Sequence, residues 1–83
     1  MQELRWSAIV GTEQGDLRIE EGGPIFYGRD GARLNADQLR RSDVGLLFAG
    51  AGPSAEAEVR LHGVRTALRR AAIPFAMTQM RFS

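Results

Sequence analysis

The first part of the chain alternates hydrophobic and polar residues with the period of two that is typical of half-buried strands. The alternating segments are residues 4–10, 17–20, 25–27 and, after an Asp-Gly turn, 32–34. Residues rich in glycine and polar side chains separate them at 11–16, 21–24 and 29–31. Short strands joined by such turns pair as successive hairpins. The N-terminal part therefore predicts an antiparallel β-meander.

The pattern changes at Asn35, which has a glutamine three residues later at Gln38. This spacing is that of a capping box and predicts a short helix over residues 36–41. The apolar run over residues 44–49 then favours a strand that is covered on both faces. The alternative is one longer helix that continues through this run, but Gly45 would cost such a helix about 1 kcal/mol.

A long helix is predicted over residues 54–72. Acidic residues lie in its first turns and Arg69 and Arg70 in its last, as the helix dipole favours, and Pro74 closes the segment. Residues 57, 61, 64, 68 and 71 fall on one side at 100° per residue and predict the buried stripe. A final strand is predicted over residues 75–82, parallel to the strand at 44–49 through a right-handed crossover.

The sequence thus predicts an α+β fold in one small domain over residues 1–83. An N-terminal antiparallel β-meander is followed by a short helix, a strand, a long helix and a C-terminal strand, in the order β-β-β-α-β-α-β. A chain of 83 residues supports only one hydrophobic core. No run of apolar residues is long enough to span a membrane, and the N-terminus has no signal-peptide pattern. Without cysteine, the chain suits a reducing environment, so we expect a cytoplasmic protein with no membrane partner.

The same composition removes most catalytic chemistry. There is no lysine or cysteine, and His62 is the only histidine, so we expect no catalytic residue, no metal site and no cofactor. The segment Gly50-x-Gly52-x-x-Ala55 does match a relaxed dinucleotide-binding pattern at the start of a helix. Pro53 removes one of the amides that would hold phosphate, so a tight strand-to-helix turn is favoured over a nucleotide- or phosphate-binding site.

Charge is divided unevenly along the chain. Residues 1–58 hold six arginines and ten acidic residues, whereas residues 59–83 hold five arginines and no acidic residue. The chain has eleven arginines and no lysine. This bias is explained either by codon usage in a GC-rich genome or by selection for the bidentate contacts of the guanidinium group. The long helix carries most of the C-terminal arginines. Trp6 falls at an inward strand position, which favours a place in the core over the alternative role of anchoring a protein partner. The predicted partner-binding residues are Trp6, Arg60, His62, Arg65, Arg69, Arg70 and Arg81.

These features predict a non-enzymatic protein-binding module that blocks or bridges a larger protein or nucleoprotein complex. Small cysteine-free domains without a catalytic centre are common among phage and mobile-element proteins, including inhibitors of bacterial defence such as anti-CRISPR proteins. That likeness is one of size and composition alone. The alternative is a nucleic-acid-binding protein that uses the arginines of helix 54–72 on phosphates, although the net charge of only +1 weakens it. Both a monomer and a homodimer fit the sequence.

Overall fold

A computed structural model describes residues 4–48 and 54–79 of the chain. The elements along these residues are β1 (Leu4–Val10), β2 (Glu13–Glu20), β3 (Gly23–Gly28), β4 (Arg33–Leu34), α1 (Ala36–Arg40), β5 (Val44–Phe48), α2 (Ala55–Arg70) and β6 (Ala76–Gln79). The predicted α+β class and the predicted order of elements are both confirmed. The short return at residues 32–34 forms the fourth strand of the meander.

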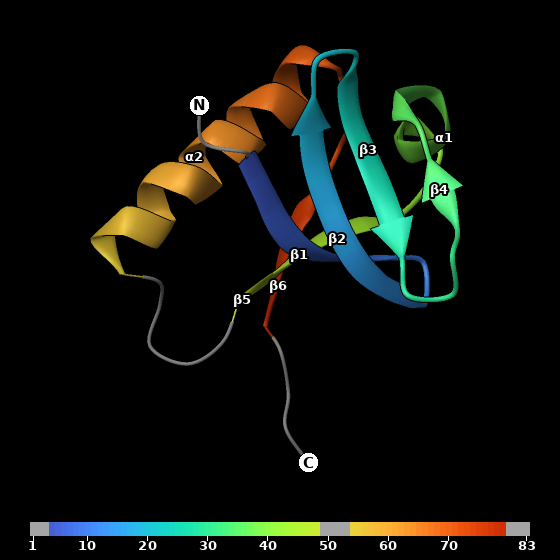
Figure 1. Ribbon diagram of the computed structural model, residues 1–83, viewed down its shortest axis with the longest axis horizontal. Coiled ribbons are helices and arrows are strands. Elements are labelled where there is room, and N and C mark those ends of the chain that lie inside the picture. The colour runs from blue at the N-terminus through green and yellow to red at the C-terminus, as the bar shows by residue number, and fades with distance from the viewer. Residues whose placement is uncertain (1–3, 49–53, 80–83) are drawn as a thin grey trace.

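The strands form one sheet in the order β4-β3-β2-β1-β5-β6 (Figure 1). Strands β1 to β4 pair antiparallel with their neighbours, and β5 also runs antiparallel to β1. Strand β6 pairs parallel with β5, since α2 carries the chain back between them. The apolar run is therefore a strand over its described residues 44–48, as favoured, and the alternative of one longer helix is wrong. None of the helices described is long and apolar enough to cross a membrane.

Both helices pack on the same face of the sheet. Leu39 of α1 and Leu61, Val64 and Leu68 of α2 join one apolar cluster with the inward residues of the strands. The inward residues that are fully or almost fully buried include Ala8, Val10, Leu17, Phe26, Val44 and Leu46. The alternation of β1 predicted Ala8 and Val10, and the stripe on α2 predicted Leu61, Val64 and Leu68. The core thus fills the space between one layer of helices and one layer of strands.

On the opposite face of the sheet, none of the residues described forms a helix. The apolar run of β5 had predicted a strand that is covered on both faces. Gly45 and Leu47 point to this side and are nevertheless buried. Ile9 and Thr78 from the two neighbouring strands close over Gly45, where an added Cβ would lie 2.6 Å from the Thr78 hydroxyl oxygen. Side chains within the sheet therefore bury β5 without a second helical layer.

Two strands begin earlier than their turn residues predicted. Strand β2 starts at Glu13, because Gly11, with φ +63°, allows a tight turn over Gly11 and Thr12 alone. Strand β3 starts at Gly23 and contains Pro24. Proline is tolerated there because β4 pairs with β3 only at Phe26 and Tyr27, so beside Pro24 one edge of β3 has no strand partner among the residues described. Strand β6 ends at Gln79 in the described part, and the predicted continuation to residue 82 lies outside it.

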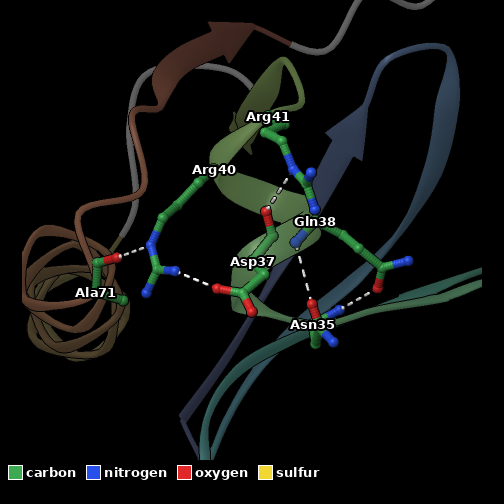
Figure 2. A network of polar contacts seen from close by, with 6 residues as sticks. All are labelled: Asn35, Asp37, Gln38, Arg40, Arg41 and Ala71. Carbon is green, nitrogen blue, oxygen red and sulfur yellow. Dashed lines mark hydrogen bonds and ion pairs between the residues drawn. The ribbon is translucent and has the colours of Figure 1, made fainter.

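The capping box of α1 is present as predicted (Figure 2). The Asn35 side chain accepts a hydrogen bond from the Gln38 amide at 3.0 Å, and the Gln38 side chain accepts one from the Asn35 amide at 2.9 Å. Arg40 pairs with Asp37 and also donates from Nε to the carbonyl oxygen of Ala71, at 2.6 Å. This last bond ties α1 to the C-terminal end of α2 (Figure 2).

Helix α2 has Ser54 as its N-cap, and the hydroxyl of Ser54 accepts a hydrogen bond from the Ala57 amide. The helix ends through Ala72, whose φ of 59° is left-handed. The amides of Ala72 and Ile73 bond back to the carbonyls of Arg69 and Leu68. Such bonds satisfy the last carbonyl groups of the helix and turn the chain toward β6.

Candidate partner-binding surfaces

The sheet face that carries no helix among the described residues is called the open face. By strand register it consists of Arg5, Ser7 and Ile9 of β1, Gln14, Asp16, Arg18 and Glu20 of β2, Ile25 and Tyr27 of β3, Arg33 of β4, Gly45 and Leu47 of β5, and Ala76 and Thr78 of β6. The alternation that buries one side of each strand also selects these outward residues. Their character differs between the two ends of the sheet.

The end formed by β2, β3 and β4 is charged and centres on Tyr27. The guanidinium carbons of Arg18 and Arg33 lie 4.9 Å and 5.9 Å from the centre of the Tyr27 ring. The Tyr27 hydroxyl donates a hydrogen bond to Glu20. Cation–π contacts of this kind hold arginine side chains over the face of an aromatic ring. Tyr27 and its arginines thus form an ordered polar surface rather than a set of independent side chains.

The end formed by β1, β5 and β6 is uncharged at its outward positions apart from Arg5. We call Ser7, Ile9, Gly45, Leu47, Ala76 and Thr78 the neutral half of the open face. An open depression of about 460 Å³ lies at this end, lined by Ile9, Gly45, Ala76 and Thr78 together with the strand-end residues Gly11, Ser42, Asp43, Val44, Pro74 and Phe75. The open face therefore combines a hollowed region, whose outward strand residues are uncharged and which Asp43 borders, with a neighbouring region rich in arginine and tyrosine.

Trp6, one of the predicted partner-binding residues, lies on the helix side of β1. It is partly buried against the core, and its indole Nε1 donates to the carbonyl oxygen of Leu47 at 2.7 Å. The Arg60 guanidinium carbon lies 5.3 Å from the centre of the Trp6 ring. The structure thus brings Trp6 and Arg60 together.

The other predicted residues of α2 are distributed over different sides of the helix. His62 and Arg70 are exposed, and Arg65 is half-buried, with its Nε enclosed and without a hydrogen-bond partner in the described part. Arg69 lies over the Phe75 ring, with 5.6 Å between guanidinium carbon and ring centre. On the helical wheel, Arg65, Arg69 and His62 share one flank of the buried stripe and Arg60 lies on the other. These residues therefore do not form one continuous patch, and Arg81 lies outside the described residues.

Two further expectations concerned bound groups. The segment Gly50-x-Gly52 falls outside the described residues, so the strand-to-helix turn stays a prediction. Within residues 4–48 and 54–79, no cluster of three His, Asp or Glu side chains is arranged to hold a metal ion.

Comparison with known proteins adds no family to this description. No family model, no curated protein and no solved structure matches the chain. Its function has to be argued from its own surfaces.

The Tyr27 cluster was missed by the sequence analysis. A signal was available, because Arg18, Tyr27 and Arg33 occupy the outward positions of three successive predicted strands. The sequence does not give the register in which neighbouring strands pair. In the structure, Tyr27 lies directly opposite Arg33 on β4 and diagonal to Arg18 on β2. Alternation gives the side of each residue, and only the pairing shows which residues meet.

Proposed function

We propose that this chain is a non-enzymatic protein-binding module that presents the open face of its sheet to a larger protein or nucleoprotein complex. One observation carries the proposal: both helices lie on a single face of the six-stranded sheet. The other face offers a hollowed region whose outward strand residues are uncharged and which Asp43 borders, next to a region rich in arginine and tyrosine. Protein interfaces have a similar composition. Charged residues are depleted at the centre of an interface, and Tyr and Arg are more frequent in it than on the rest of the protein surface.

The mechanism that we propose is steric. A rigid domain seated on a larger partner blocks or bridges the surface that it covers, and needs no chemistry of its own. Inhibition of a bacterial defence complex by a phage or mobile-element protein is one such role, supported here by size and composition. The cysteine-free sequence suits a partner in the reducing cytoplasm.

Affinity capture with two matched charge reversals tests this proposal. Arg5→Glu changes the open face at an exposed position directly opposite Arg18, where an acidic residue is favourable for folding. Arg70→Glu makes the same change at an exposed position of α2. Each protein is used as bait, after nuclease treatment, in lysates of the cells that naturally produce it.

We expect the wild type and Arg70→Glu to retain the same partner protein and Arg5→Glu to lose most of it. Equal retention by the two variants would show that the open face is not the contact. Loss with Arg70→Glu alone would transfer the interface to α2.

Nucleic-acid binding is the second candidate, and the flank of α2 that carries Arg65, Arg69 and His62 favours it. Arginines one turn apart on a helix suit successive phosphates. The double substitution Arg65→Glu with Arg69→Glu is then expected to abolish salt-sensitive binding to labelled duplex DNA or single-stranded RNA. Unchanged affinity in that variant would exclude this use of the helix.

A further inference from the structure

The two edges of the sheet differ in how they are protected from further pairing. Strand β4 at one edge has only two residues, includes the charged Arg33 and lies against α1. Strand β6 at the other edge, Ala76–Gln79, has no charged residue and no proline. Edge strands are normally shielded by charge, shortness, proline or a covering element. Among the described residues, only β4 has such protection.

The depression described above lies beside the β6 edge. Ala76 and Thr78 of β6 border it, and Asp43 lies at the same end, immediately before β5. Ala76 carries a small side chain, so a long side chain from a strand added outside β6 can cross it to reach the Asp43 carboxylate. Gly45 is the β5 partner of Ala76 and Asp43 lies two residues before Gly45, so the path from such a strand to Asp43 covers two strand spacings and two residues along the strand, about 12 Å. This is within the combined reach of an arginine and an aspartate.

The helix side of the same edge exposes apolar residues, and the Arg69 guanidinium lies over Phe75 there. Met77 points to this side and remains 38% exposed, and the half-buried Phe75 precedes it. Methionine side chains adapt readily to the shape of an apolar partner. A strand added to β6 would therefore place alternate side chains in two environments, one beside Met77 and one over the depression toward Asp43.

We propose that an extended segment of the partner protein adds to β6 as a seventh strand, with a basic side chain directed to Asp43 and apolar side chains beside Met77. The inference rests on the proposed function, since it names the part of the partner that binds. Backbone hydrogen bonds to β6 provide most of the affinity in this mode, and the alternate side chains provide the specificity. The acidic Asp43 selects a basic segment over an acidic one.

The probe for the test is a capped peptide in which arginine alternates with valine, long enough to pair along β6. A second peptide replaces every arginine with glutamate, and a third repeats the first with N-methyl groups on every residue. N-methylation of every residue removes the amide donors along both edges of the peptide and leaves its side chains and charge in place. Binding to the full chain is followed by NMR, with amide shifts and hydrogen-exchange protection assigned along β6.

We expect the arginine peptide to bind with changes centred on Ala76–Gln79 and the N-methylated peptide to lose that binding. Asp43→Asn is expected to weaken the arginine peptide about two- to fivefold, the range of a partly exposed ion pair. The matched control Glu21→Gln, an exposed carboxylate in the β2–β3 turn, should leave affinity unchanged. Asp43→Arg should reverse the preference between the arginine and glutamate peptides.

Three results would overturn the inference: no binding of the arginine peptide, equal binding of its N-methylated form, or shifts confined to other elements. If the peptide fails while Arg5→Glu still releases the captured partner, the open face binds a protein by a route other than strand addition. If the peptide binds at β6 but no captured protein depends on Arg5, the edge inference holds and the proposed use of the open face is wrong.

Discussion

Replacing Gly15 with alanine is expected to destabilise the protein by about 3 kcal/mol, because β2 and β3 approach too closely there for a side chain. A Cβ atom at Gly15 would lie 2.8 Å from the Gly28 Cα and 2.9 Å from the Tyr27 carbonyl carbon, and closer still to the carbonyl oxygen. Carbon atoms in contact prefer separations of about 3.5–4.0 Å, so the two backbones would have to part by roughly 1 Å. Overpacking costs about 1–3 kcal/mol when side chains can rotate away, and a paired backbone cannot.

Urea unfolding measures this effect. Small proteins have slopes of about 1–3 kcal/mol per molar urea, so we expect the midpoint for Gly15→Ala to fall by about 1–3 M. Gly22→Ala is the matched control, because an added Cβ at Gly22 meets nothing within 4 Å and its φ is not left-handed. Equal midpoints for the two variants would refute the close approach of β2 and β3 at Gly15.

Three other substitutions test separate parts of the fold by the same measurement. Ala72→Gly should raise stability by about 1 kcal/mol, because Ala72 has a left-handed φ of 59° that glycine adopts without strain; a lower midpoint would contradict that conformation. Asn35→Ala should cost about 1 kcal/mol by removing the capping box of α1, and a neutral result would show that the cap contributes nothing. Trp6→Phe should cost about 1–2 kcal/mol because it removes the indole donor to the Leu47 carbonyl, and unchanged stability would mean that this bond is not formed.

The alternation of β1 and the apolar stripe of α2 predicted the core residues of these two elements, because each pattern reports one buried side of a single element. The capping residues Asn35 and Gln38 predicted the start of α1 for the same local reason. Gly15 was predicted to belong to a turn, but it lies within β2 and lets β3 approach closely. The sequence alone does not distinguish a glycine with this role from a glycine in a turn. Element type is a local property, whereas the exact start of β2 depends on its pairing with β1 across the turn at Gly11 and Thr12.

The candidate surfaces were less predictable. The contacts of Arg60 with Trp6 and of Arg69 with Phe75 depend on how α2 crosses the sheet, which no local pattern contains. The sequence also did not predict that both helices lie on one face of the sheet, because the apolar run of β5 is typical of a strand between two helical layers. Gly45 and Leu47 are buried by neighbouring side chains instead, and that packing follows from the strand order.

Site-specific photo-crosslinking tests the central claim most directly. A photoreactive amino acid is placed at Ser7, which is exposed on the open face, or at Val59, which is 74% exposed on α2. Each protein is produced in its natural cells, irradiated and analysed for covalent adducts. The open-face account predicts one discrete protein adduct from Ser7 and none from Val59. An adduct from Val59 with none from Ser7 would contradict it and place the binding surface on the helix.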